Sequence, residues 1–121
     1  AWYCSNIFTL ETKKNTYYLA IINSIYSSKD IIQSIKAFEL TNQGLNDSLR
    51  LMKTAEGLKN SLSVHFDFFS VVDRPERPVI VIQYDPKKQT ISLSETNEKE
   101  EIISATQTYR FNGRYFETEQ K

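Results

Sequence analysis

Apolar side chains recur at every second position in several short stretches of this chain, a spacing that belongs to strands rather than helices. Between residues 62 and 69, one strand face would carry Leu62, Val64, Phe66 and Phe68, and the other Ser63, His65, Asp67 and Phe69. The runs 16–22 and 79–84 are apolar at successive positions and rich in β-branched and aromatic residues. Such runs are typical of central strands that are covered on both faces.

Turn residues separate these runs at hairpin spacing. Lys13-Lys14-Asn15 lies between the alternating segment 8–12 and the run 16–22, so these two segments are expected to pair. Asn112-Gly113 is the strongest hairpin signal in the chain. A two-residue loop at that position predicts the pairs Phe111–Arg114, Arg110–Tyr115 and Tyr109–Phe116.

Two segments fit either a strand or a helix. In a helix, Ile31, Ile35 and Phe38 would form one stripe, with Asp30 as the N-cap. In a strand, 31–40 would lead through the turn residues 41–44 back to Leu45, and we favour this hairpin interpretation. The secondary structure of the segment 47–58 is left undecided between strand and helix, since Gly57 interrupts its helical spacing.

The prediction is a mainly β domain, an antiparallel sandwich or partly open barrel of about seven to nine short strands. The alternative is an α+β domain with a helix near 30–39. At 121 residues, the whole chain 1–121 is expected to form a single globular domain. Because it opens on Ala1-Trp2 rather than on Met, we expect a processed chain or a piece of a longer protein.

Composition excludes several function classes. Lys plus Arg and Asp plus Glu both number 15, so the basic excess that a non-specific nucleic-acid binder needs is missing. No run approaches the ~20 apolar residues of a membrane-spanning helix. With one Cys, one His and three Gly, the chain cannot build a disulfide, a multi-Cys zinc site or a glycine-rich phosphate loop. We therefore expect no cofactor and no metal.

Three segments of the chain carry a resemblance to known proteins. These are 17–30, the stretch 67–78 with its Asp73-Arg74-Pro75-Glu76-Arg77-Pro78 loop, and the ending 109–117 with Phe111-Asn112-Gly113-Arg114-Tyr115-Phe116. Together they resemble an uncharacterised strand-rich C-terminal domain of secreted or cell-envelope proteins of Gram-negative bacteria. The resemblance implies an extracytoplasmic location, in the periplasm, at the cell surface or secreted, and transfers no catalytic residues.

The loop 73–78 is the leading candidate binding site. Its two prolines limit the entropy lost on binding, and Arg74 and Arg77 offer planar forks for a carboxylate or phosphate. The alternative is a rigid corner in which Asp73 and Glu76 already neutralise the two arginines. We thus expect a non-catalytic binding or interaction module of an exported bacterial protein, with a protein or carbohydrate partner contacted by Arg74, Glu76, Arg77, His65 and Asp67.

Two other functions remain as alternatives. His65 and Asp67 lie two residues apart on one strand face and could act as base and orienting carboxylate of a small hydrolase. That hypothesis needs a nucleophile, and no Ser lies in a glycine-flanked elbow. The third possibility is a structural or assembly domain, which a large apolar patch at the Trp2 end would favour.

Overall fold

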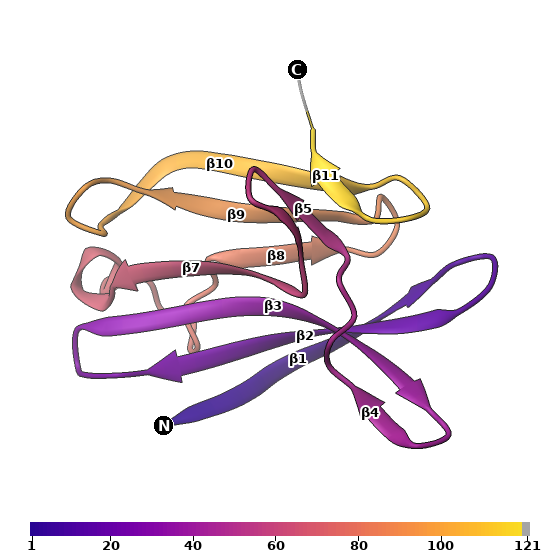
Figure 1. Cartoon of the computed structure of the whole chain (residues 1–121). Coiled ribbons are helices and arrows are strands. Elements are labelled where there is room, and N and C mark those ends of the chain that lie inside the picture. The colour runs from indigo at the N-terminus through magenta and orange to yellow at the C-terminus, as the bar shows by residue number, and fades with distance from the viewer. Residues whose placement is uncertain (120–121) are drawn as a thin grey trace.

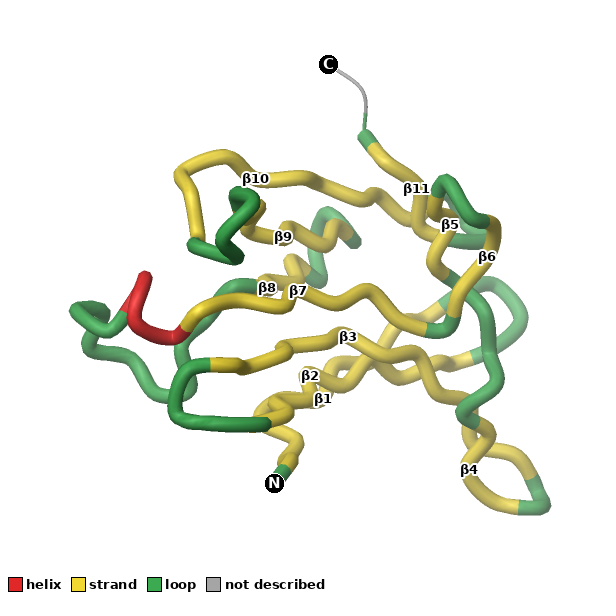
Figure 2. The backbone as a smooth tube through the Cα atoms, turned by 60° about the vertical axis from the view of Figure 1, so that its left-hand side comes forward, coloured by secondary structure: helices red, strands yellow, loops and turns green. Residues whose placement is uncertain are grey.

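A computed structural model describes residues 1–119, which form eleven strands, one short helix and their connecting loops. The strands make two sheets that lie one over the other, with the N-terminus on the lower layer in Figure 1 and the C-terminal strand on the upper one. The turned view of Figure 2 shows the same two layers. The predicted mainly β sandwich is confirmed, and the sheets do not close into a barrel.

The first sheet, sheet A, contains the N-terminal half of the chain. Its order is β1 (Trp2–Glu11), β2 (Thr16–Ile25), β3 (Asp30–Thr41) and β4 (Gly44–Asn46), with β7 (Ser61–Asp67) also paired to β3. Strands β7 and β4 share the far edge of β3, because β7 pairs with residues 30–36 and β4 with residues 39–41. All of these pairs are antiparallel.

The second sheet, sheet B, contains most of the C-terminal half. Its order is β6 (Gly57–Lys59), β5 (Met52–Thr54), β11 (Phe116–Thr118), β10 (Ile102–Phe111), β9 (Thr90–Thr96) and β8 (Ile82–Asp85). Among the strands of residues 1–119, β5 and β11 alone pair in parallel. The short 3-10 helix η1 (Phe68–Val71) follows β7. Among the described residues, no helix has the length and hydrophobicity to cross a membrane.

Residues 30–41 form a strand, so the strand interpretation of this segment is confirmed and the helix alternative is wrong. The inner face of β3 alternates strictly, with Gln33, Ile35 and Ala37 buried. This period of two outweighs the helical stripe because both edges of β3 gain backbone hydrogen-bonding partners. The segment 47–58 likewise contains strand residues and no helix.

The terminal hairpin is confirmed, but its predicted register is wrong by two residues. Phe111 pairs with Phe116 and Arg110 with Glu117, leaving 112–115 as the loop. The Asn112 side chain accepts hydrogen bonds from the backbone N–H groups of Arg114 and Tyr115, and this stabilises the longer loop. In this register the Phe111 and Phe116 rings meet in the core, with centroids 5.1 Å apart.

The run 79–84 is strand only from Ile82 onward. The buried Gln33 side chain explains the difference. Its Nε2 donates to the Val79 carbonyl at 2.9 Å, and its Oε1 accepts from the N–H groups of Val81 and Ile82, both at 2.9 Å. A side chain of sheet A thus replaces the neighbouring strand that 79–81 would otherwise need.

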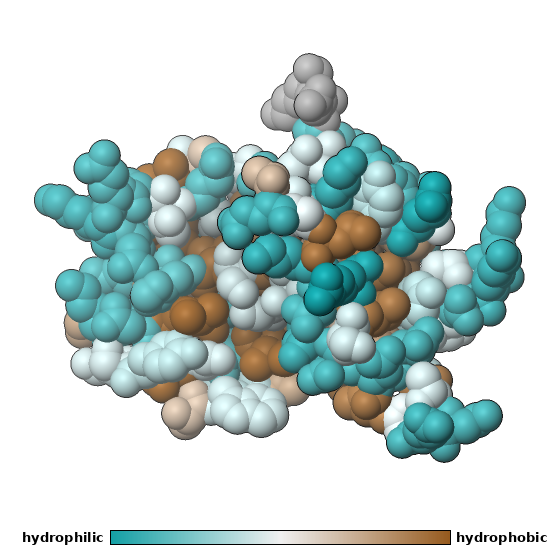
Figure 3. Space-filling model, viewed as in Figure 1, coloured by the Kyte–Doolittle hydropathy of each residue, from teal (hydrophilic) through white to brown (hydrophobic). Residues whose placement is uncertain are grey.

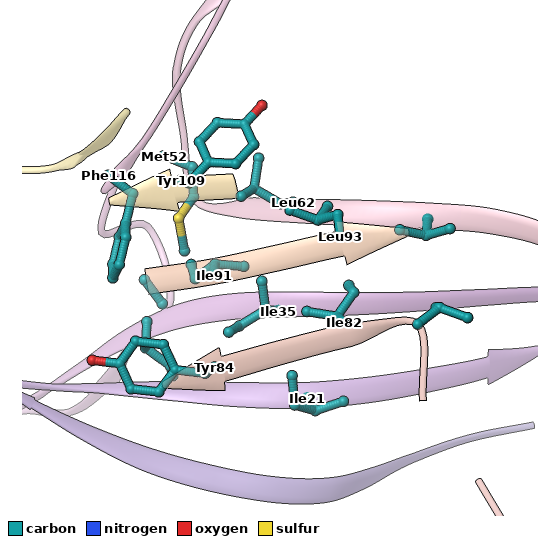
Figure 4. Close-up of a cluster of buried hydrophobic side chains, with 14 of the residues drawn as sticks. Ile21, Ile35, Met52, Leu62, Ile82, Tyr84, Ile91, Leu93, Tyr109 and Phe116 are labelled. Atoms are coloured by element: carbon teal, nitrogen blue, oxygen red, sulfur yellow. The ribbon is translucent and has the colours of Figure 1, made fainter. Parts of the chain in front are cut away.

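The hydrophobic core fills the space between the sheets. Figure 4 shows side chains from both sheets pointing toward one another in this cluster. The most deeply buried include Leu10, Leu19, Ile35, Met52, Phe66, Ile91 and Phe116. Phe68 and Phe69, predicted to continue the strand alternation, belong instead to η1, with Phe68 packed against the core and Phe69 exposed.

Candidate functional site

His65 lies on the outward face of β7 between two carboxylates. Its Nδ1 is 2.7 Å from a carboxylate oxygen of Glu100, and its Nε2 is 3.9 Å from one of Asp30. Asp67, the predicted orienting residue, does not contact the ring. Within residues 1–119, no hydroxyl or thiol hydrogen-bonds to the imidazole, and the Cys4 thiol donates to the Asn6 carbonyl on β1. Each ring nitrogen of His65 thus faces a carboxylate, Nδ1 that of Glu100 and Nε2 that of Asp30.

Asp67 has a local structural task. One carboxylate oxygen accepts a 2.9 Å hydrogen bond from the Phe69 N–H and so caps η1, while the other lies 3.8 Å from Lys29 Nζ. Backbone bonds around it join three chain segments: the Asp67 N–H donates to the Glu100 carbonyl and the Phe68 N–H to the Lys29 carbonyl. Through these contacts, Asp67 connects the end of β7 to η1 and to Lys29.

In the loop 73–78, the two arginine side chains donate hydrogen bonds to backbone carbonyls. Arg74 Nη1 donates to the Ile80 carbonyl at 3.2 Å. Arg77 donates to the carbonyls of Val72, Arg74 and Glu76, and its guanidinium lies 5.2 Å from the centre of the Phe68 ring. The predicted neutralisation by Asp73 and Glu76 is not found, since no carboxylate among the described residues forms an ion pair with either arginine.

The predicted partner-binding residues therefore fall into two groups. His65 and Asp67 face outward from β7, whereas Phe66 between them faces the core. Arg77 contacts Phe68 at the end of that strand, and Glu76 is half-buried with its carbonyl bound to Arg77. No hydrogen bond or ion pair joins the two groups within residues 1–119.

A different surface is more unusual, namely the outer face of sheet A. The strand registers place apolar side chains of four strands together, because Cys4 pairs with Ile22, Ile7 with Ala20, and Leu40 with Leu45. We define the apolar outer face by its members: Trp2, Cys4, Ile7, Tyr18, Ala20, Ile22, Phe38, Leu40 and Leu45. Four of these are largely exposed: Trp2 at 71%, Ile7 at 67%, Leu40 at 66% and Leu45 at 65%.

The outer face of sheet B provides an internal comparison. There the registers align Gln83 with Ser92 and Ser92 with Thr108, and Ser94 with Thr106, a polar surface of the kind that water covers. In the space-filling view, coloured by hydropathy, hydrophilic residues are prominent at the left and right ends of the visible face (Figure 3). Leu58 on β6 is also exposed, at 45%, but the most exposed aliphatic side chains, Ile7, Leu40 and Leu45, lie on sheet A.

The apolar outer face also has a hollow. A groove of about 750 Å³ lies over the face, with small Ala20 among larger neighbours that include Trp2, Ile7, Phe38 and Leu45. Its charged groups are Lys36 and Asp47, which pair with each other at 3.5 Å. Because this pair is internally neutral, a surface that fits the groove would be uncharged and apolar.

Sequence patterning missed this face. The prediction considered an apolar patch only at the Trp2 end, whereas the face extends to Leu40 and Leu45 on the β3–β4 hairpin. The available signal was the run 16–22, which is apolar at both odd and even positions. No protein-family model, curated protein or solved structure matches this chain.

Proposed function

We propose that this domain is a non-catalytic interaction module that binds a protein partner through the apolar outer face of sheet A. The observation that carries the proposal is the contrast between the two outer faces, because Trp2, Ile7, Leu40 and Leu45 are largely exposed on sheet A, whereas the central strands of sheet B align serine, threonine and glutamine. A monomeric soluble domain seldom exposes a contiguous apolar surface across several strands, and such surfaces mark interaction sites.

The chemistry of the face favours a protein over a carbohydrate. Sugars are bound by flat aromatic surfaces accompanied by polar groups that fix their hydroxyls. Here the most exposed side chains besides Trp2 are aliphatic, namely Ile7, Leu40 and Leu45. Aliphatic groups gain most by packing against apolar side chains, as at the centre of a protein interface.

Site-specific photo-crosslinking tests this proposal in the cells that make the protein. A photoreactive residue replaces Leu45 on the apolar outer face or, as the control, Thr106 on the polar outer face of sheet B. We expect a discrete crosslinked species from position 45 and none from position 106. A species of twice the chain mass would identify a second copy, and another mass a different protein. Equal crosslinking from both positions, or none from position 45, would contradict the proposal.

For the location, we propose an extracytoplasmic compartment on the strength of the resemblance to envelope and secreted proteins. Fractionation of the producing cells tests this independently of the binding face. Recovery with the periplasmic or extracellular fraction is expected, and recovery with cytoplasmic marker proteins would contradict it.

A further inference from the structure

A second hollow lies on the other side of sheet A, inside the sandwich where β1 begins. It has a volume of about 260 Å³ and opens to solvent. Its surface is mostly apolar, with deeply buried side chains as the floor and partly exposed ones at the rim. The lining includes Tyr3, Ile31, Phe66, Phe68, Val79 and Arg77.

Two of the neutral polar side chains that line this cavity, Asn23 and Ser27, already have partners, whereas the Tyr3 and Ser28 hydroxyls form no hydrogen bond within residues 1–119. Asn23 donates to the Ser5 hydroxyl at 2.9 Å and accepts from Gln33 at 2.8 Å. The Ser27 hydroxyl contacts Asp30 and accepts from N–H groups of its own turn. A ligand in the cavity would therefore meet apolar surface, the hydroxyls of Tyr3 and Ser28, and one charged group, the guanidinium of Arg77.

Arg77 is held in position and has free donors. Three of its five N–H groups bind backbone carbonyls, two from Nη1 and one from Nη2. The remaining two are the Nε–H and the second Nη2–H. The guanidinium carbon lies 5.2 Å from the centre of the Phe68 ring, and Phe68 lines the same cavity. Since no carboxylate in residues 1–119 pairs with it, its positive charge is available to an anion.

We infer that this cavity binds a small apolar monocarboxylate, with its hydrocarbon part against Phe66 and Val79 and its carboxylate on Arg77. Two free donors match the two oxygens of one carboxylate. A phosphate dianion would need more donors and a second cation. The volume lies just below the usual range for drug-sized ligands, so it suits a single ring or a short branched chain.

The test is a titration of the full chain with 3-phenylpropanoate, followed by NMR of the isoleucine and valine methyl groups. We expect saturable shifts at Ile25, Ile31 and Val79, with a Kd on the order of 1 mM for a ligand of this size. The matched probe is 3-phenylpropanamide, which has the same shape and no charge. It should bind on the order of tenfold more weakly, the effect of losing one charge-assisted contact.

Two variants show whether ligand binding depends on the Arg77 guanidinium or on the shape of the loop. Arg77→Gln should lower the affinity for 3-phenylpropanoate about tenfold and leave the affinity for 3-phenylpropanamide unchanged. Arg74→Gln is the control, because Arg74 lies in the same loop but does not line the cavity. If Arg77→Gln disturbs the structure of the loop, the comparison of 3-phenylpropanoate with 3-phenylpropanamide on the unsubstituted protein still tests the role of the charge.

A peptide ending in phenylalanine, set against the same peptide with a C-terminal amide, shows whether the carboxylate can come from a chain terminus. Binding of the acid form at the same methyl groups supports the inference. Equal binding of acid and amide, or no shifts at Ile31 and Val79, would overturn it. Shifts at Ile7 and Ile22 would report the apolar outer face instead, so failure here leaves the protein-binding proposal intact.

Discussion

Gln33 is the residue on which the joining of the two sheets depends most directly. It is 1% exposed, and its amide satisfies backbone groups of residues 79, 81 and 82 as well as the Asn23 side chain. Each buried hydrogen bond contributes a modest net free energy, but a buried group left without a partner costs about 1–3 kcal/mol. Removing this amide would leave several such groups at once.

We therefore predict that Gln33→Leu, which conserves volume, lowers the free energy of unfolding by about 3 kcal/mol or more. Chemical denaturation followed by circular dichroism measures this change. Gln107→Leu is the matched control, because Gln107 lies exposed on β10 and should change stability by less than about 0.5 kcal/mol. Similar losses in both variants would show that Gln33 does not hold 79–82 in place.

At the scale of the element, two tyrosines on the inner face of sheet B respond to pH. Burial raises the pKa of Tyr84 on β8, with a smaller contribution from the Asp85 charge, and burial raises the pKa of Tyr109 on β10. A raised folded-state pKa means that the folded protein keeps protons that the unfolded chain releases. This contribution to stability is complete below the ordinary tyrosine pKa near 10 and is lost as pH rises above it.

We predict that stability falls with increasing pH above about 10 and that Tyr84→Phe reduces the slope. Thermal unfolding at several pH values gives the slope, and ultraviolet titration of tyrosinate follows the ionisation. Tyr26→Phe is the control, because Tyr26 is largely exposed. An unchanged slope in the Tyr84 variant, or all tyrosines titrating together near pH 10, would be inconsistent with the buried positions.

The strands and hairpins differ in how well the sequence pattern predicts them. Alternation predicted a strand over 62–69, of which 62–67 belong to β7, and turn residues predicted the hairpins around 13–15 and 112–113, because side-chain spacing and turn residues are local properties. It failed where a distant side chain decided the outcome. Gln33 supplies the hydrogen bonds of 79–81, and the Phe111–Phe116 contact accompanies the longer terminal loop. Nothing in the neighbouring residues signals either interaction.

At the scale of the whole molecule, the candidate sites were only partly predictable. Arg77 was identified from its proline-rich loop, but the cavity beside it also needs Tyr3 and Ile31 from other strands. The apolar outer face likewise depends on the registers of β1 to β4, which bring together residues as distant as Trp2 and Leu45. Both surfaces arise from tertiary pairing, which a single run of residues does not reveal.

If sheet A binds a protein partner as proposed, its apolar outer face is covered when the protein performs its function. Covalent footprinting of side chains in intact producing cells, compared with the purified chain, measures this coverage directly. We predict severalfold lower labelling of Trp2, Ile7 and Leu45 in cells, with Leu58 on β6 as an exposed apolar control that labels equally in both. Equal labelling of all four residues in both settings would contradict the claim.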